Sequence, residues 1–325
     1  MKRKWVVVTG AAGFIGSVLV KKLYDEGLEF IIGIDDFTNK AKEKNILSKP
    51  FKETIQREKV EDFLNKFGHE VSFVFHIGAR TDTTEKNEAV FNTLNLLPSK
   101  MWWTFCSDEG IPLVYASSAA TYGNGEHGFD DNHEIIPLLK PLNPYGQSKQ
   151  NFDLWALQQF RKPPKWYGLK FFNVFGPNEY HKGRMASVVF HAYHQIRETG
   201  KIRLFRSHRL DFKDGEQARD FIFVKDVVDV IAFLYEYLPQ EGIYNVGTGQ
   251  ARTFLDLAHA IFSALHEKPT IEFIDTPEDI RETYQYFTEA RMEKLRKAGY
   301  TKPFTSLEKS VADYVTNYLI PGKYE

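Results

Sequence analysis

Short runs of apolar residues alternate along the chain with longer stretches whose apolar residues recur at helical spacing. The short runs cover residues 5–9, 30–35, 71–77, 112–117, 167–173 and 243–246, and helical patterns cover 14–26, 87–109, 146–161 and 225–238. Strands that are apolar on both faces and alternate with helices are typical of a parallel sheet covered on both sides. The pattern therefore predicts an α/β fold built on a doubly wound parallel sheet.

A glycine-rich turn separates the first predicted strand from the first predicted helix. Residues 9–16 read TGAAGFIG, so that Gly10, Gly13 and Gly16 have the spacing GxxGxxG. Gly10 allows a sharp turn, Gly13 allows the backbone to approach a pyrophosphate, and Gly16 allows the helix to lie close to the strand. The helix amino terminus adds N–H donors and a positive dipole end. We interpret this segment as the dinucleotide-binding turn of a Rossmann fold.

The second predicted strand ends on two carboxylates, Asp35 and Asp36. Asp35 lies 19 residues beyond Gly16, where a carboxylate can bind the ribose of an adenosine. The two carboxylates favour NAD because they repel a 2′-phosphate. However, Lys40, Lys42 and Lys44 follow closely, and their ammonium groups could neutralise the charge of a 2′-phosphate. These residues leave the choice between NAD and NADP open.

Tyr145 and Lys149 form a YxxxK pair at the start of a predicted helix, where a spacing of four places both side chains on one face. A tyrosine with a pKa of about 10 is a poor base near neutrality, but a nearby ammonium and a nicotinamide cation both favour the phenolate. Ser118 ends a predicted central strand and can hydrogen-bond both a substrate oxygen and the tyrosine. The three residues predict proton removal from a hydroxyl whose carbon loses hydride.

Two further segments occupy positions where cofactor contacts belong. The sequence HIGART, residues 76–81, ends the predicted strand 71–77, and its Gly78 and Ala79 allow the backbone to pass the adenosine and ribose. Asn95, on the next helix, could steady these loops or could be an ordinary polar residue.

Composition narrows the function further. The net charge is −1 and no basic run is present, so we expect neither nucleic acid nor a membrane as partner. The single cysteine, Cys106, cannot form an internal disulfide, and no stretch approaches 18 consecutive apolar residues; we expect a cytoplasmic protein. The ten histidines form no tight ligand cluster, so we expect no metal.

These motifs together resemble the extended short-chain dehydrogenase/reductase family, whose further mark here is FNVFGP at 172–177. Within the family, the chain is similar over essentially its full length to the epimerases that act at C6″ of an ADP-linked heptose. The specific segments are HIGARTDTTE (76–85), ASSAATYG (116–123), PLNPYG (141–146) and HKGRMASV (181–188).

The resemblance implies conversion of ADP-D-glycero-D-manno-heptose to its L-glycero epimer, for lipopolysaccharide core heptose supply. A bound NADP, with NAD as the alternative, takes hydride from C6″ and returns it to the other face. The resemblance also implies a homo-oligomer, often a pentamer. Inversion needs proton transfer at two faces, and Lys182 matches the second acid/base. Lys182 could instead be a phosphate contact or an ordinary surface lysine.

Motifs and resemblance together define the expected site. We expect the cofactor to contact Gly10, Gly13, Phe14, Ile15, Gly16, Asp35, Asp36, Lys42, Ile77, Gly78, Ala79, Arg80, Asn95, Tyr145, Lys149, Val174 and Lys182. We expect the substrate to contact Ser118, Asn173, Arg184, His191, Phe205, Arg206, Ser207, Arg219 and Tyr284. Residues 1–173 and 219–249 would form the NAD(P)-binding domain, and residues 174–218 and 250–325 a smaller, mainly helical substrate-binding lobe.

Some residues depart from the family pattern. Asp36 stands where NADP-using relatives often have asparagine, Arg184 replaces a smaller residue, and the segment 206–219 is longer than in many relatives. The alternatives are a UDP-hexose 4-epimerase, a 4,6-dehydratase and a non-catalytic nucleotide sensor. A dehydratase usually has an Asp-Glu pair after the active-site serine, where this chain has AATYG, and a sensor often lacks the tyrosine or lysine.

Overall fold

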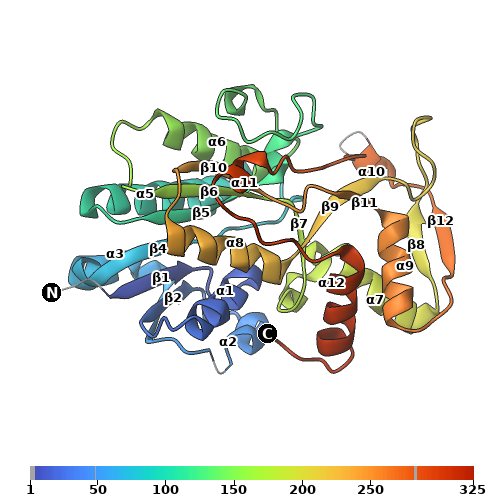
Figure 1. Ribbon diagram of the computed structural model, residues 1–325, viewed down its shortest axis with the longest axis horizontal. Helices are drawn as coiled ribbons and strands as arrows, with labels where there is room; N and C mark the ends of the chain where they lie inside the picture. The colour runs from blue at the N-terminus through green and yellow to red at the C-terminus, as the bar shows by residue number, and fades with distance from the viewer. Residues whose placement is uncertain (1–3, 48, 282–283) are drawn as a thin grey trace.

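A computed structural model describes residues 4–47, 49–281 and 284–325. Its centre is a seven-stranded parallel sheet in the order β10-β6-β5-β4-β1-β2-β3 (Figure 1). The strands are β1 (Trp5–Thr9), β2 (Ile31–Asp35), β3 (Glu53–Gln56), β4 (Val71–His76), β5 (Leu113–Ser118), β6 (Trp166–Phe171) and β10 (Gly242–Val246). The doubly wound parallel sheet predicted from the apolar runs is thereby confirmed.

The strand order reverses between β1 and β4, and this reversal creates the crevice in which ligands of such sheets bind. The register pairs Thr9, at the end of β1, with Ile34 on one side and His76 on the other. On the far side of β4, Ser118 at the end of β5 pairs with Phe171. The ends of β1, β2, β4 and β5 therefore meet at one edge of the sheet.

Helices cover both faces of this sheet. On one face α1 (Phe14–Asp25) packs against α8 (Val224–Tyr237), and on the other face α5 (Leu97–Glu109) and α6 (Pro144–Gln158) pack together over β4 and β5. The remaining helical segments are η1 (Lys40–Lys42), α2 (Glu43–Ile46), η2 (Arg57–Lys59), α3 (Val60–Phe67), η3 (Gly68–Glu70), α4 (Glu88–Phe91), η4 (Asn92–Leu96), η5 (Ala119–Tyr122), η6 (Ile136–Leu138), η7 (Tyr180–Met185), α7 (Val188–Thr199), α9 (Phe254–Ala264), α10 (Glu278–Arg281), α11 (Glu293–Lys297), α12 (Leu307–Tyr314) and η8 (Val315–Leu319).

A buried ion pair holds α6 against the sheet. The Lys170 ammonium lies 2.7 Å from the Asp153 carboxylate, and neither side chain is exposed. Tyr115 and Ser117, both on β5, donate hydroxyl hydrogen bonds to the same carboxylate at 3.1 and 2.7 Å, and Lys170 also donates to Thr121 at 2.6 Å. Because buried charges are tolerated only when they are fully paired, this cluster fixes the helix that bears Tyr145 relative to the strand that bears Ser118.

The segment 87–109, predicted as one helix, is divided into three. It begins as α4, widens into one π-helical turn at η4 and continues as α5. Pro98 explains the widening, because it has no backbone N–H to donate and its ring clashes with the carbonyl four residues earlier. The wider turn directs Asn95 inward, where it is 1% exposed.

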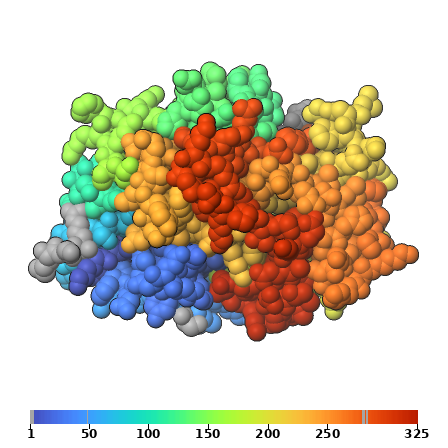
Figure 2. Space-filling view, in the orientation of Figure 1, coloured from blue at the N-terminus to red at the C-terminus, as the bar shows by residue number. Residues whose placement is uncertain are grey.

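The stretches 174–218 and 250–325, expected to be mainly helical, also contain strands. The strands β7 (Asn173–Phe175), β9 (Ala218–Phe223) and β11 (Ala251–Thr253) form one small sheet, and β8 (Ile202–Phe205) and β12 (Ile271–Ile274) form another. In Figure 1, β8 and β12 lie at the right-hand end of the molecule, and β7, β9 and β11 lie between them and the seven-stranded sheet. The last residues of the chain, red in Figure 2, cross the middle of the visible face. Among the described residues, no helix is long and apolar enough to cross a membrane.

Candidate active site

The glycine turn has the shape that a dinucleotide needs. Gly10 has a φ of 67°, and a Cβ there would lie 2.6 Å from the Gly78 Cα. A Cβ on Gly16 would lie 2.1 Å from the Gly10 carbonyl oxygen, so α1 can approach the turn only without a side chain at this position. Helix α1 begins at Phe14 after Gly13, which has no side chain to cap it. The turn and helix terminus therefore fit a pyrophosphate.

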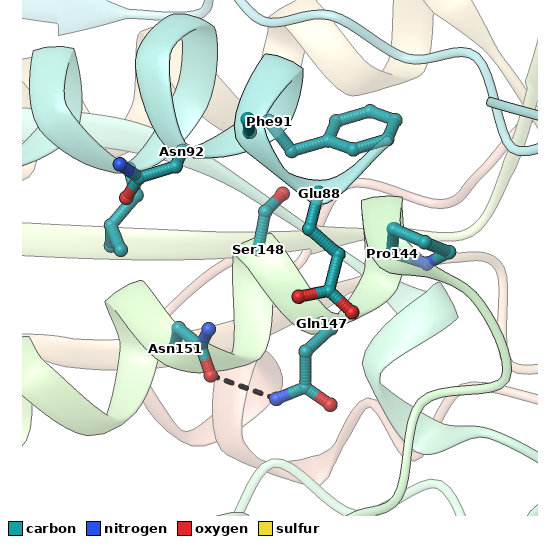
Figure 3. Close-up of a pocket in the computed structure, with 9 residues that line it drawn as sticks. Glu88, Phe91, Asn92, Pro144, Gln147, Ser148 and Asn151 are labelled. Atoms are coloured by element: carbon teal, nitrogen blue, oxygen red, sulfur yellow. Dashed lines mark hydrogen bonds between the residues drawn. The ribbon is translucent and has the colours of Figure 1, made fainter. Parts of the chain in front are cut away.

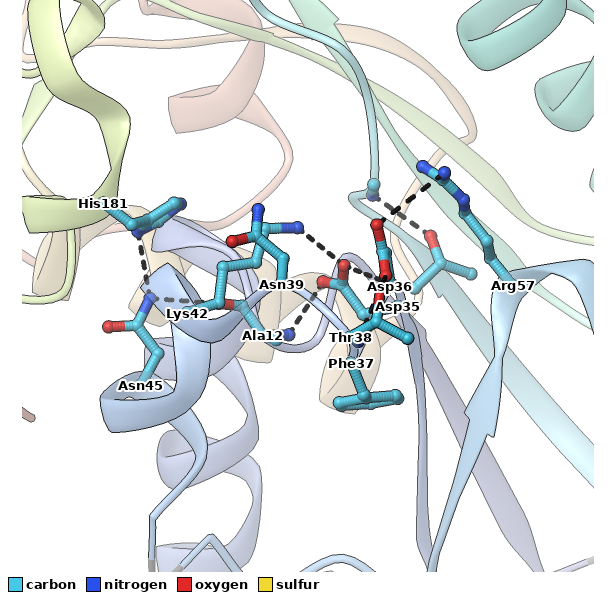
Figure 4. A network of polar contacts seen from close by, with 12 residues as sticks. Ala12, Asp35, Asp36, Phe37, Thr38, Asn39, Lys42, Asn45, Arg57 and His181 are labelled. Carbon is cyan, nitrogen blue, oxygen red and sulfur yellow. Dashed lines mark hydrogen bonds and ion pairs between the residues drawn. The ribbon is translucent and has the colours of Figure 1, made fainter.

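The end of β2 forms a charged cluster beside this turn (Figure 4). Asp35 accepts hydrogen bonds from the Ala12 N–H at 2.9 Å, the Asp36 N–H at 2.7 Å and the Lys42 ammonium at 2.7 Å. The Asp36 carboxylate accepts hydrogen bonds from Thr38, and these bonds lower the pKa of Asp36. The same carboxylate lies 3.8 Å from the Arg57 guanidinium. Two carboxylates and two cations thus surround the place where the adenosine ribose of a dinucleotide belongs.

Buried polar contacts fix the loop that follows β4. The Thr9 hydroxyl lies 2.8 Å from His76 Nδ1 and accepts from the Gly78 N–H at 3.1 Å. Asn95 accepts from the Arg80 N–H at 2.7 Å and donates to the Arg80 carbonyl at 3.0 Å. Of its two sequence interpretations, the geometry therefore favours the one in which Asn95 steadies this loop.

Acidification is expected to destabilise the protein through His76. Burial first, and the Lys149 charge second, lower the pKa of His76 to about 3, whereas an unfolded histidine has a pKa of about 6.5. Because the unfolded chain binds the proton more readily, the stability is present above about pH 6.5 and is lost as the pH falls toward 3. Between pH 7 and 4 this histidine alone removes about 3 kcal/mol from the free energy of unfolding.

Urea unfolding between pH 4 and 7 measures this effect. His76→Asn should flatten the pH dependence by about that amount, whereas His69→Asn, which removes an exposed histidine, is the control. Burial also lowers the pKa values of His133 and His181 to about 4, so some pH dependence should persist. An unchanged slope in His76→Asn would contradict the prediction.

Helix α6 brings the YxxxK pair to the end of β5. Asn143 caps the helix by accepting from the Gly146 N–H at 2.8 Å, and Pro144 occupies its first position. Burial raises the pKa of Tyr145, while a hydrogen bond with Ser118 lowers it. Burial lowers the pKa of Lys149 to about 8, and its ammonium donates to the Ala116 carbonyl at 2.8 Å. The three expected catalytic residues of this face are therefore brought together.

Lys182 lies in the short helical segment η7, next to a cavity of about 260 Å³. Its ammonium is 5.7 Å from the centre of the Phe14 ring, which is the first residue of α1. Burial lowers the pKa of Lys182, while the nearby Glu179 carboxylate raises it. The cavity is lined by Phe172, Asn173, Val174, Phe175, Glu179, Lys182, Met185, Ala186, Ser187, Val188, Val189 and Phe221. Lys182 is thus half-buried beside the cofactor turn.

Five of the nine expected substrate residues lie in two separate groups, whereas Ser118 lies at Tyr145 and Asn173 lines the Lys182 cavity. Phe205, Arg219 and Tyr284 lie together: the Phe205 and Tyr284 ring centres are 5.9 Å apart, and the Arg219 guanidinium is 5.4 Å from the Tyr284 ring. Arg219 is buried and donates to the Ala218 and Gln285 carbonyls. Arg184 and His191 meet elsewhere, where His191 Nε2 lies 3.3 Å from the Arg184 carbonyl oxygen.

Several of these polar groups are held by other side chains. The Arg184 guanidinium lies 3.5 Å from Asp82 and is mostly exposed. Arg206 lies 3.4 Å from Asp275 and 3.8 Å from Asp214, and Asp214 also accepts from the Ser207 N–H at 2.8 Å. The long segment 206–219 is therefore held by Asp214 from within the segment and by Asp275 from outside it.

Sequence reasoning missed two buried polar residues near Lys182. Glu179 is 1% exposed and accepts from the Ser187 hydroxyl at 2.7 Å and the Gly176 N–H at 3.2 Å. Asn45, also 1% exposed, contacts the same loop from α2. Neither residue belongs to a recognisable motif, and both stand in polar stretches of the sequence, so no local signal marks them as buried.

A second cavity, of about 250 Å³, lies between α4, η4 and α6 (Figure 3). Its polar side chains come mainly from exposed positions, and Gln147 donates to Asn151 across its edge at 2.7 Å. Neither Tyr145 nor Ser118 lines it, so it is separate from the reacting groups. Within the described ranges, no group of three or more His, Cys, Asp or Glu side chains is arranged to hold a metal ion.

Comparisons with known proteins agree with this geometry. The chain is 46% identical over 324 residues to an ADP-L-glycero-D-manno-heptose-6-epimerase of Fusobacterium nucleatum, covering 97% of this chain and 98% of the relative. A solved Helicobacter pylori enzyme of the same name matches with a TM-score of 0.80 and 25% identity, over 97% and 96% of the two chains. A Thermus thermophilus UDP-glucose 4-epimerase in complex with NAD matches with a TM-score of 0.75 and 25% identity, over 95% and 97%.

The model of the NAD dependent epimerase/dehydratase family matches residues 6–247, which include the glycine turn, Ser118 and the YxxxK pair. This agreement confirms the family that the motifs indicated and supports a nicotinamide dinucleotide as cofactor. The chain therefore belongs to the NAD-dependent epimerase/dehydratase family.

Proposed function

We propose that this protein is an isomerase that converts ADP-D-glycero-D-manno-heptose to ADP-L-glycero-D-manno-heptose by inversion at C6″, in the supply of heptose for lipopolysaccharide core. The observation that carries the proposal is 46% identity, over nearly the whole of both chains, to an enzyme named for this activity. The segment HKGRMASV at 181–188, with Lys182 beside the cofactor turn, supports the same reaction.

The runner-up is a UDP-hexose 4-epimerase, and the fold alone does not separate the two. The Helicobacter pylori and Thermus thermophilus enzymes share 25% identity with this chain and have TM-scores of 0.80 and 0.75. Both reactions use the same sheet and a Tyr/Lys pair, so the distinction depends on the sequence. The much higher identity to the heptose epimerase favours the first reaction.

The proposed mechanism assigns one task to each side chain. The glycine turn, Asp35 and Lys42 would hold a nicotinamide cofactor, which would supply hydride acceptance from C6″ and hydride return to the opposite face. Tyr145 Oη takes the proton from the C6″ hydroxyl, and the Lys149 ammonium and the Ser118 hydroxyl stabilise the resulting phenolate. As hydride returns to the second face, the Lys182 ammonium would give a proton to the C6″ ketone oxygen. Proton exchange with water would then restore the Tyr145 phenolate and the Lys182 ammonium. Burial keeps both lysine pKa values below their ordinary range, which makes proton exchange near neutral pH easier.

The domain and pocket assignments are part of the proposal. Residues 174–218 and 250–325 would hold the ADP-heptose, and the buried Arg219, beside Phe205 and Tyr284, would bind its diphosphate by bidentate contacts. Cys106 is buried and free, which supports a reducing, cytoplasmic location. Resemblance to the family supports a homo-oligomer, which light scattering after size exclusion would measure.

We propose NADP as the preferred cofactor, because the Lys42 ammonium lies at the ribose end of the cofactor crevice. Lys42→Met should weaken NADP binding by about 10-fold to 100-fold, the value of one charge-assisted hydrogen bond. NAD binding should change much less, because NAD has no 2′-phosphate. Calorimetric titration of both cofactors measures this, with Lys44→Met as the control in the same segment. Tighter binding of NAD than of NADP to the native protein would contradict the proposal.

An epimerisation assay tests the function directly. The purified protein is incubated with ADP-D-glycero-D-manno-heptose and, separately, with UDP-glucose, and the epimers are separated by anion-exchange chromatography. Conversion of the ADP-heptose alone, without net cofactor reduction, is the expected result. Conversion of UDP-glucose alone would preserve the Tyr145 and Lys149 chemistry but assign the protein to the 4-epimerases.

A further inference from the structure

Asn45 links three segments that are distant in sequence (Figure 4). Its side-chain amide lies 3.0 Å from the Ala12 carbonyl oxygen in the glycine turn and 3.0 Å from the Asn178 carbonyl oxygen in the loop before Lys182. It also lies 3.2 Å from His181 Nδ1. A buried amide must find partners for its N–H groups, and the partners of this one within the described part of the chain belong to the cofactor turn or the Lys182 loop.

One hydrogen assignment gives an acceptor to the Nδ1–H of His181 and to both amide hydrogens of Asn45. Burial lowers the pKa of His181 to about 4, so the ring is neutral near pH 7. If Nδ1 carries the proton, it donates to the Asn178 carbonyl at 3.1 Å. The two hydrogens of Asn45 then go to the Ala12 and Asn178 carbonyls, since a carbonyl oxygen can accept two bonds. Asn45 and His181 thus hold the Asn178 carbonyl together.

The loop has a second attachment to the cofactor turn. Asn178 has a left-handed backbone, with a φ of 75°, and is fully buried. Its side-chain amide donates at 2.9 Å to the hydroxyl of Ser17, in the first turn of α1. Because Lys182 is only four residues further along and its backbone N–H donates to the Glu179 carbonyl at 2.9 Å, the position of its ammonium depends on these attachments.

Asn45 is also joined to the residues around the adenosine end of the cofactor crevice. Asn39 caps η1, the turn that contains Lys42, by accepting from the Ala41 N–H at 3.1 Å. Helix α2 begins directly after η1 and contains Asn45. Lys42 and Asn45 therefore lie in one continuous short helical segment, in which Lys42 pairs with Asp35 and Asn45 binds the Lys182 loop.

We infer that Asn45 is a positioning residue that couples cofactor binding at Asp35 and Lys42 to the placement of the His181–Lys182 loop. A cofactor that engages Lys42 fixes the η1–α2 segment, and the Asn45 amide then fixes the Asn178 carbonyl and the histidine. The inference rests on the proposed cofactor site and on the proposed role of Lys182, but its test measures hydrogen exchange in the loop directly.

Amide hydrogen exchange, followed by mass spectrometry of peptides covering residues 180–186, tests the coupling. In the native protein, saturating NADP should slow exchange in this loop by about tenfold or more, as expected when a locally opening segment is tied down. In Asn45→Asp, the carboxylate faces two carbonyl oxygens and cannot donate, so the cofactor-induced slowing should be lost while NADP still binds. Asn45→Ala removes the donor without adding charge and should lose the slowing as well.

A matched control and a kinetic measurement separate coupling from general loosening. Asn39→Asp keeps a hydrogen-bond acceptor at the cap of η1, where Asn39 binds the Ala41 N–H and not the Lys182 loop. NADP should therefore slow exchange in residues 180–186 of this variant as much as in the native protein. In the Asn45 variants, kcat should fall about tenfold or more with little change in KM, the pattern of a misplaced catalytic group. The coupling is wrong if both Asn45 variants retain the NADP-induced slowing, or if the native loop shows none.

The same experiments separate this inference from the proposed function. Absence of any cofactor binding to the native protein would overturn the cofactor proposal and the coupling together. Full activity of a Lys182 variant would overturn only the acid/base proposal, because NADP-dependent exchange in 180–186 would still report the coupling.

Discussion

Tyr145→Phe is expected to lower kcat for epimerisation by about 10²–10⁴-fold, the usual contribution of a positioned acid/base. The substitution removes only the hydroxyl that we propose takes the C6″ proton and leaves the ring, which packs with its centre 6.2 Å from that of Phe91. The fold around α6 should persist, because the helix is held by the Asn143 cap and the Asp153–Lys170 ion pair. Turnover is measured by chromatographic separation of the two epimers.

The control for this prediction removes a different buried hydroxyl. The Tyr300 hydroxyl is buried and has no hydrogen-bond partner among the described residues, so Tyr300→Phe should retain native turnover. Cofactor binding should be within about tenfold of native in Tyr145→Phe, since the cofactor loses at most one hydrogen bond. Native turnover in Tyr145→Phe would remove this residue from the mechanism.

Much of the arrangement of the candidate site could be predicted because its residues lie at the ends of elements with strong local signals. Gly10, Asp35 and Ser118 each follow a short apolar run, and parallel strands bring such ends to one edge of the sheet. The YxxxK pair needs only one helix to bring Tyr145 and Lys149 to one face. Strand alternation and glycine spacing therefore indicated the fold, the cofactor crevice and the Ser/Tyr/Lys cluster.

Features that depend on distant partners could not be predicted in this way. The strand β12 forms because Ile271 pairs with Ile202 on β8, and neither segment shows a strong strand pattern alone. Asn45 reads as an ordinary polar residue of a solvated loop, yet it is buried by contacts with residue 178. Pro98 did carry a signal for the π-helical turn, since proline disrupts a helix locally, but the long helical pattern around it concealed this effect.

Lys182→Met tests the proposed proton transfer on the second face of the ketone. It should lower kcat by about 10²–10⁴-fold with little change in KM. A methionine retains the apolar stem that packs toward Phe14, so folding should be largely spared. If Lys182 were only a phosphate contact, the substitution would raise KM and leave kcat near native, because the interaction would serve ground state and transition state alike. The two kinetic constants, measured with ADP-D-glycero-D-manno-heptose, therefore separate the two roles.

Lys182→Arg distinguishes charge from proton transfer at the same position. Arginine retains the positive charge but cannot give up its proton in a protein. An acid/base at residue 182 therefore predicts that Lys182→Arg is nearly as slow as Lys182→Met, whereas a phosphate contact predicts a variant close to native. Arg184→Met removes an exposed cation two residues further along and should affect KM alone. If Lys182→Arg keeps the native kcat, the second proton must move through another group, and the buried Glu179 in the same cavity becomes the residue to replace next.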